Sequence, residues 1–130
     1  MDIPQHAHVL VIDGGKSRLF RNSGTDSDPK LVAVESPADN DEHSAAASGV
    51  SQDDYHQQAE DRIAITAADM LKREVLAGHI KALIVVAAPK TLGVLRPHYH
   101  GAVQKCLVGE IAKDFAGRPV DEITAAILSH

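Results

Sequence analysis

Three acidic residues, Asp13, Glu110 and Asp114, are the side chains of this sequence best suited to metal chemistry. Asp13 ends a short apolar run that starts at His8, and a Gly-Gly pair follows it. In some nucleases a carboxylate at the end of the first strand helps to hold Mg²⁺, which needs further oxygen ligands close by. Glu110 and Asp114 supply these ligands if their segment is a helix that faces Asp13, and the chain would then be a metal-dependent hydrolase or nuclease. The alternative is that Asp13 orders the turn through backbone hydrogen bonds.

Arg96, Lys90 and Arg18 are the basic residues most suited to binding an anion or RNA. Arg96 follows a buried strand and a proline, and ligands of open α/β sheets tend to bind beyond the carboxyl ends of the strands. Lys90 and Arg18 can join it as contacts to phosphate groups. The alternative is a structural ion pair between Arg96 and either Glu110 or Asp114.

The histidines and the single cysteine form no strong zinc motif. There are eight histidines; His98 and His100 flank Tyr99, and His43, His56 and Cys106 are the remaining candidate ligands. None of their spacings is typical of zinc sites. Cys106 beside His98 or His100 is a candidate nucleophile, although a lone cysteine is more often a small core residue. We therefore predict no cofactor.

A phosphate-binding loop is excluded by the residues that surround a partial match. Gly14-Gly15-Lys16-Ser17 resembles the end of such a loop, but the earlier glycine of the motif is replaced by Leu10. The residues that follow alternate like a strand, whereas the motif requires a helix. The sequence therefore has no P-loop nucleotide site.

The composition indicates a single α/β domain, spanning residues 1–130, with an aliphatic core. Hydrophobic residues make up 44% of the chain but aromatic residues only 3%, which disfavours a stacking surface for single-stranded nucleic acid. The net charge of -5 disfavours non-specific binding to phosphate backbones. One cysteine allows no internal disulfide. The chain shows no signal peptide and no apolar run long enough to span a membrane, so we expect a cytoplasmic protein.

The first half of the chain is predicted to form an antiparallel meander and a long helix. The three strands are His8 to Asp13, Ser17 to Asn22 and Leu31 to Glu35. The polar segment at about 36–52 is predicted to be a mobile loop, since it has little apolar content. Ser51 can cap the helix that follows, and Gly78 can end it.

The second half contains the most diagnostic segment, Ala82 to Ala88, which is continuously apolar and β-branched. Such a run is typical of a strand that is covered on both faces at the centre of a sheet. A short helix (Thr91 to Arg96), a further turn or two (His98 to Cys106) and a terminal helix (Val120 to Leu128) follow. Leu107 to Phe115 is either strand or helix. The fold class is therefore α/β, with a mixed five-stranded sheet in three layers and helices on both faces, as in ribonuclease H-like proteins.

Several strings of the sequence are specific enough to compare with a known family. They are Val11-Ile12-Asp13-Gly14 with Arg18-Leu19-Phe20, the run Leu83 to Pro89 with Leu92-Gly93-Val94-Leu95-Arg96, and Glu110, Lys113 and Asp114 with Pro119 to Ile123. Together they resemble the bacterial host-attachment protein family over nearly the whole chain apart from the loop. That resemblance implies a non-enzymatic protein that binds a protein or RNA partner, and it leaves a homo-oligomer open.

The same family is similar, more distantly, to the middle domain of archaeal and eukaryotic peptide-chain release factors. In those proteins a Gly-Gly-Gln tip, on the loop before a long helix, acts at the ribosomal peptidyl-transferase centre. Here the corresponding loop carries Ala45-Ala46-Ala47-Ser48-Gly49, and the Gly-Gly pair is followed by Lys16. The resemblance therefore implies, as an alternative function, a translation- or ribosome-associated factor without the catalytic tip.

Overall fold

The computed structural model describes residues 1–13, 16–34, 52–115 and 118–130, and for Asp13 and residues 52–60 it describes the backbone alone. The expected mobile loop at about 36–52 lies outside these ranges except for Gln52. The Gly14-Gly15 turn also lies outside them.

The elements follow one another as a meander, a long helix, and a second half in which short helices alternate with strands. They are β1 (His8–Asp13), β2 (Lys16–Asn22), β3 (Leu31–Val34), α1 (Gln52–Leu76), β4 (Leu83–Ala87), α2 (Pro89–Leu95), the 3₁₀ turn η2 (Arg96–His98), α3 (Gly101–Cys106), β5 (Leu107–Ala112) and α4 (Val120–Leu128).

The five strands form one mixed sheet with the order β3-β2-β1-β4-β5. The first three strands pair in antiparallel fashion, whereas β4 pairs in parallel with both β1 and β5. All five residues of β4 are buried, so the apolar run lies in the interior of the sheet as expected. The predicted α/β class with a mixed five-stranded sheet is therefore confirmed.

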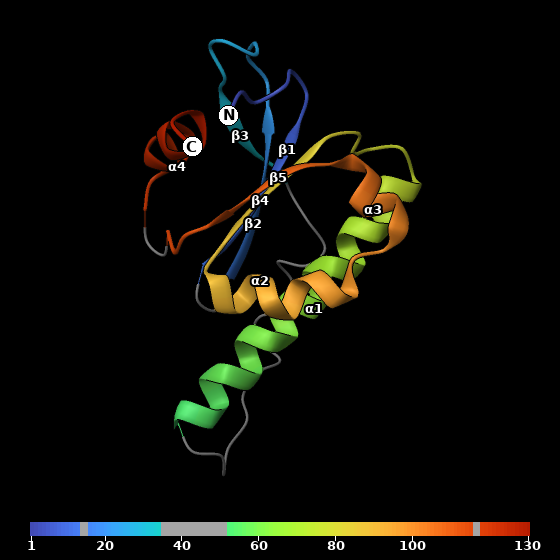
Figure 1. The fold of residues 1–130 in the computed structure, drawn as a ribbon, viewed down its shortest axis with the longest axis vertical. Coiled ribbons are helices and arrows are strands. Elements are labelled where there is room, and N and C mark those ends of the chain that lie inside the picture. Colours follow the sequence, from blue (N-terminus) through green and yellow to red (C-terminus); the bar gives the residue numbers. More distant parts are fainter. Residues whose placement is uncertain (14–15, 35–51, 116–117) are drawn as a thin grey trace.

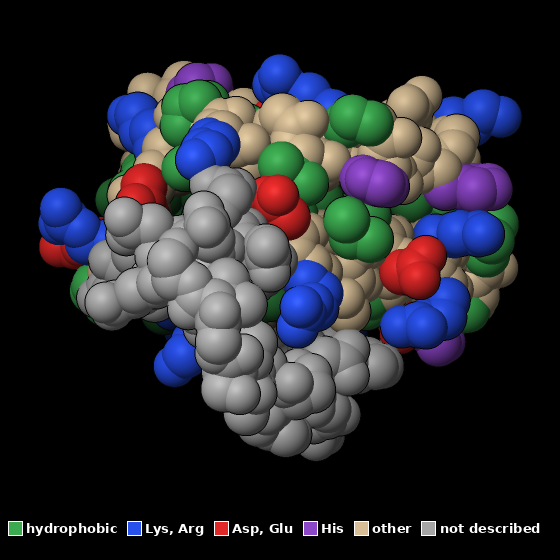
Figure 2. All heavy atoms as spheres, turned by 90° about the horizontal axis from the view of Figure 1, so that it is seen from below, with side chains coloured by type: hydrophobic (Ala, Val, Ile, Leu, Met, Phe, Trp, Pro, Cys, Tyr) green, Lys and Arg blue, Asp and Glu red, His purple; other side chains and the backbone are tan. Residues whose placement is uncertain are grey.

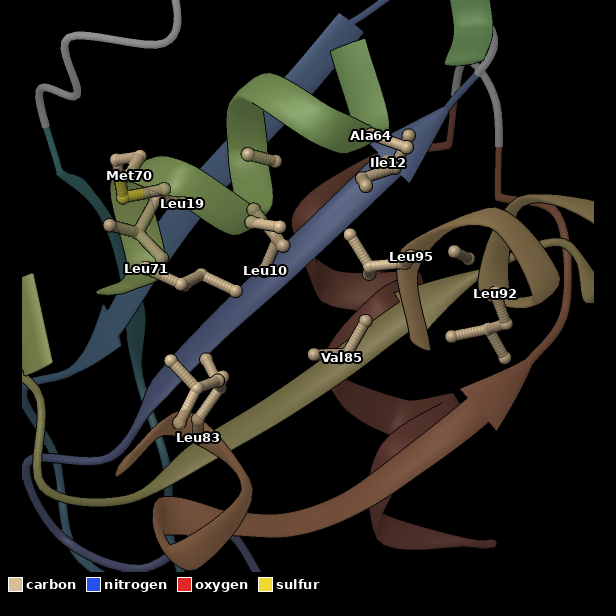
Figure 3. Close-up of a cluster of buried hydrophobic side chains, with 14 of the residues drawn as sticks. Leu10, Ile12, Leu19, Ala64, Met70, Leu71, Leu83, Val85, Leu92 and Leu95 are labelled. Carbon is tan, nitrogen blue, oxygen red and sulfur yellow. The ribbon is translucent and has the colours of Figure 1, made fainter. Parts of the chain in front are cut away.

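Side chains on the two faces of the sheet enter separate hydrophobic cores, which gives the molecule three layers (Figure 1). One core contains the inward faces of α1, α2 and α3 with Leu10, Leu83 and Val85, some of which Figure 3 shows. The other contains α4 with Val9 and Ile84. The alternation along β1 and β4 therefore decides which helix each residue contacts.

The segment that the sequence left open, Leu107 to Phe115, is a strand over its first six residues. Strand β5 pairs with β4 from Leu107 onward, with an irregularity in register between Leu83 and Ile84. Ile111 on β5 packs into the α4 core, while its neighbour Glu110 lies on the other face. No helix within the described ranges combines the length and apolar content needed to cross a membrane.

Asn22, at the end of β2, ties the meander to the N-terminal segment. Its buried side-chain amide donates to the carbonyl oxygens of Ile3, Pro4 and Thr25 at 3.0, 3.3 and 3.2 Å. Its side-chain oxygen accepts from the backbone N–H groups of Gly24 and Lys30, both at 2.9 Å. One side chain therefore satisfies the backbone groups of the turn that β-strand pairing leaves open.

Candidate functional site

The segment from α2 to α3 is a basic surface that lacks acidic residues. Residues 89–106 contain Lys90, Arg96 and Lys105 but no Asp or Glu, in a chain whose net charge is -5. All three basic residues are exposed. The local charge of this segment is therefore opposite in sign to the charge of the whole chain.

Local sequence explains how this segment is held. Pro89 starts α2 directly after β4, since a proline at the first helical position loses no hydrogen bond. Leu92 and Leu95 are buried beneath α2, and Val103 is buried beneath α3. These apolar anchors direct the intervening polar residues toward solvent.

Arg96 is fixed at the end of α2 by an ion pair with Glu110 of β5. Its Nε lies 3.1 Å and its Nη2 lies 3.0 Å from Oε1 of Glu110. The side chain of Glu110 is only 18% exposed, while that of Arg96 remains 57% exposed. The inner edge of the guanidinium is therefore oriented by the protein, and much of its surface stays accessible to a partner.

Tyr99 completes this arrangement from the turn after η2. Its hydroxyl donates to Oε2 of Glu110 at 2.9 Å, so both carboxylate oxygens of Glu110 accept hydrogen bonds. Burial raises the pKa of Tyr99 well above its ordinary value, and the hydrogen bond to Glu110 and the charge of Glu110 raise it further. Tyr99 is thus a neutral donor that positions Glu110, which in turn positions Arg96.

Two of the three basic residues singled out by sequence lie on one surface, while the third lies elsewhere. Lys90 and Arg96 belong to the continuous α2–η2 segment. Arg18 shares its strand face with Phe20, which packs into the α4 core, and its Nη2 donates to the carbonyl oxygen of Arg118 at 3.5 Å. The Arg18 guanidinium also lies 5.6 Å from the centre of the Phe20 ring. The structure therefore places Arg18 and Arg96 on opposite faces of the sheet.

The three acidic candidates for a metal site, Asp13, Glu110 and Asp114, do not have the arrangement expected if Glu110 and Asp114 lay on one helix. Because Glu110 lies in a strand, Glu110 and Asp114 are not successive residues of one helix face. Glu110 is engaged with Arg96 and Tyr99, and Asp114 is exposed beyond the end of β5. The side chain of Asp13 lies outside the description. Among the described residues, no group of three His, Cys, Asp or Glu is placed to hold a metal ion.

Figure 2 shows the molecule from below relative to the view of Figure 1. Lys and Arg side chains are spread over this face, several His side chains lie toward one side, and single acidic groups stand between them. Among the side chains coloured by type, basic groups thus form separate contact points and no continuous strip. A partner of this face would be held by a few discrete charges.

Sequence reasoning missed Tyr99 as a positioning residue. Its neighbours His98 and His100 drew attention as metal ligands, but both are exposed, and the Nδ1 of His100 accepts from the backbone N–H of Ala102 at 3.0 Å. Tyr99 alone of the three packs against the core. The signal in the sequence was that Tyr99, an aromatic residue, stands between two polar residues. Such a pattern favours burial of the aromatic side chain and exposure of the two histidines.

The sheet and its helices define an α/β fold, and the segment from α2 to α3 is an exposed basic surface on it. The chain belongs to the bacterial archaeo-eukaryotic release factor family 12, whose family model matches residues 6–127. The expected likeness to release factors is therefore confirmed, and the host-attachment name does not come with this match. A comparison with curated proteins found no match.

Proposed function

We propose that this domain is a translation-associated factor that binds the ribosome through RNA and does not hydrolyse peptidyl-tRNA. The family match over residues 6–127 carries the proposal, because it connects nearly the whole chain with release-factor domains. Such a role implies a cytoplasmic location. Host attachment remains a separate hypothesis that rests on the sequence resemblance.

The absence of hydrolysis is proposed from the sequence itself. Release-factor middle domains act through a Gly-Gly-Gln tip before a long helix, and no Gly-Gly-Gln occurs anywhere in this chain. The residues before α1 instead include Ala45-Ala46-Ala47-Ser48-Gly49. We therefore expect no release of peptide from peptidyl-tRNA in an assay with purified ribosomes.

The contact surface that we propose is the segment from α2 to α3. Lys90, Arg96 and Lys105 are exposed within a stretch that has no acidic residue to repel phosphates. Arg96 is pre-oriented by Glu110, which lowers the entropy that binding would otherwise cost. A guanidinium with one edge anchored and its remaining surface accessible is suited to a phosphate oxygen.

Co-sedimentation with purified bacterial ribosomes at increasing salt concentration tests the proposal. We expect the wild-type domain to sediment with ribosomes and the Lys90→Gln/Lys105→Gln variant to bind more weakly. Each lysine that contacts a phosphate should lower the slope of log affinity against log salt by about one. A Lys30→Gln/Lys72→Gln variant, which removes two exposed lysines outside the segment, is the matched control.

Two results would contradict the proposal. A wild-type domain that stays in the supernatant at low salt has no ribosomal partner. Equal loss of binding in both double variants would show that net charge alone matters and that the surface from α2 to α3 is not the contact.

A further inference from the structure

A pocket of about 820 Å³ lies at the opposite end of the sheet from α2, where β1 and β4 begin. It is formed by three strands of the meander, the last turns of α1 and the chain that enters β4. Its volume falls within the range of small-molecule sites. The residues that line it are Gln5, His6, His8, Leu19, Arg21, Val32, Ala33, Val34, Met70, Glu74, His79, Ile80, Lys81 and Ala82. It shares none of them with the segment from α2 to α3.

The floor of the pocket is apolar and rigid. Leu19, Met70 and Ile80 are buried members of the core on the α1 face. In Figure 3 Leu19 and Met70 lie together at one end of this core, away from Leu92 and Leu95. A ligand would thus rest on side chains that the fold already holds in place.

Strand pairing places two polar residues, His8 and Arg21, side by side next to this floor. His8 pairs with Arg21, and Arg21 pairs with Val32 on the next strand. His8 is only 7% exposed, and its Nδ1 is a buried atom with no hydrogen-bond partner among the described residues. Buried polar groups of proteins are rarely left in this condition unless a water or a ligand completes them.

Burial lowers the pKa of His8, and the nearby charges of Arg21 and His79 lower it further, against an opposing effect of Glu74. The ring is therefore neutral near pH 7 and can both donate and accept a hydrogen bond. Such an imidazole beside an arginine is a suitable partner for a protonated or ionised acid group.

Two positively charged residues, Arg21 and Lys81, are exposed at the rim, and His6 and His79 are exposed beside them. The one acidic lining residue, Glu74, is engaged, because its Oε2 lies 2.6 Å from the Nδ1 of His79. The charge at the rim is thus opposite in sign to that of the whole chain, which favours an anion.

The backbone holds this rim in unusual conformations. Gly78 has a φ of 82° directly after α1, and its N–H donates to the carbonyl oxygen of Val75 at 3.0 Å. This turn brings His79 back onto the end of α1. His6 has a φ of 69°, which is rare for a residue with a side chain. Such a conformation at a non-glycine residue persists where the surroundings enforce it, often around ligand sites.

We infer that this pocket binds a small organic anion, in which a carboxylate, phosphate or sulfonate group meets Arg21 and Lys81 while an apolar body rests on Leu19, Met70 and Ile80. A metal ion is a poorer occupant, because no described group of three His, Cys, Asp or Glu is placed to hold one. The inference does not depend on the proposed ribosomal function.

Two fluorescent probes with the same apolar body test the charge requirement. The anion is 1-anilinonaphthalene-8-sulfonate, and the neutral probe is N-phenyl-1-naphthylamine, which lacks the sulfonate. Both are titrated into the folded protein at neutral pH. We expect saturable binding of the anion at one site. Replacement of Arg21 and Lys81 by Gln should weaken that binding about tenfold or more, since a charged hydrogen bond is lost.

Matched controls separate the pocket from general charge effects. Arg62→Gln/Lys72→Gln removes the same two charges from exposed positions outside the pocket and should leave the affinity for the anion unchanged. Val32→Trp, on the pocket wall, should weaken both probes by filling the space. Circular dichroism and urea unfolding establish that each variant is folded.

Three results would overturn the inference. The folded wild-type protein does not bind the anion, or it binds the neutral probe as tightly as the anion. Alternatively, the Arg21→Gln/Lys81→Gln variant binds the anion as well as the Arg62→Gln/Lys72→Gln control. Because none of these measurements involves ribosomes, their outcome is independent of the co-sedimentation result.

Discussion

Glu110 is the residue on which the geometry of the basic surface depends. Arg96 binds one of its carboxylate oxygens and Tyr99 the other, from two different turns of the chain. The pair with Arg96 is more than half exposed on the arginine side, so water screens much of its energy. The main effect of Glu110 is therefore orientation of its two partners.

Replacement of Glu110 by Gln tests whether this carboxylate contacts the Tyr99 hydroxyl. The free energy of unfolding should fall by about 1 kcal/mol, since an exposed ion pair and one charged hydrogen bond are weakened. The pKa of Tyr99 should move back toward its ordinary value, because the charge of Glu110 no longer opposes ionisation while burial still does. Tyrosinate absorbance in a Tyr55→Phe background reports Tyr99 alone. An unchanged Tyr99 titration would contradict the assigned contact.

His8 should make the stability of the domain depend on pH. Its folded pKa lies below the ordinary value of 6.5, so the unfolded chain takes up a proton first as the pH falls. Stability should therefore be full above about pH 7 and decline as the pH falls through 6.5 toward the folded pKa. His8→Phe removes this contribution and should show a smaller decline in urea unfolding between about pH 8 and pH 5. The exposed His98→Phe is the control and should decline like the wild type.

At the scale of elements, the connection between β2 and β3 depends on one buried amide. Asn22 takes part in five hydrogen bonds to backbone groups of the N-terminal segment and the turn. Because these bonds join segments that β-strand pairing does not reach, the register of β3 on β2 rests partly on them. The same turn sets the position of β3 beside the pocket.

Asn22→Ala should therefore lower the free energy of unfolding by about 3 kcal/mol, since several buried backbone groups lose their partners. Ser23→Ala, one residue further along, removes a single exposed contact to Lys30 and should change stability by less than about 0.5 kcal/mol. Urea unfolding monitored by circular dichroism compares the two. Similar values for both variants would show that Asn22 is not the structural node.

The elements differ in how far the sequence predicts them, and the reasons are physical. Ala82 to Ala88 was predictable as a central strand, because an uninterrupted apolar run with three β-branched residues at its centre is typical of a strand buried on both faces. Strand β5 was not predictable, since Gly109 and a register irregularity weaken its alternation. The pairing of Arg96 with Glu110 was one of two alternatives, because its choice depended on whether β5 was strand or helix.

The candidate sites were less predictable than the fold. The pocket is formed by the meander, the end of α1 and the residues before β4. Because these residues are distant in sequence, no local motif indicates that they come together. The one available signal was His8, a polar residue on the same strand face as Leu10 and Ile12. The separation of Arg18 from Arg96 required knowledge of which strand face meets which helix, and this is a property of the assembled sheet.

At the scale of the whole molecule, β4 is one of the strands whose side chains enter both cores. Leu83 and Val85 contribute to the core beneath α1, α2 and α3, while Ile84 and Val86 contribute to the core beneath α4. A change on either face of this strand should therefore weaken the whole fold and not one layer alone.

Ile84→Ala should lower the free energy of unfolding by about 3 kcal/mol through lost burial and the cavity that it leaves. Ile65→Ala makes the same chemical change on α1, where the side chain is 42% exposed, and should alter stability by less than about 0.5 kcal/mol. Thermal unfolding followed in both the near- and far-ultraviolet should show a single shared transition for Ile84→Ala. Separate transitions would indicate that the two cores unfold independently.

The parallel pairing of β1 with β4 has a consequence for the order in which the chain can fold. During synthesis β2 emerges soon after β1 and can pair with it, and β3 can then pair with β2. The other edge of β1 has no partner until residues 83–87 have been made. Closing that long separation in sequence is a slow step. Until then the nascent chain presents an open, strongly apolar strand edge, of the kind that pairs with other chains. Chains that stop at the end of α1 should accordingly aggregate, and completion of β4 is the event that protects β1.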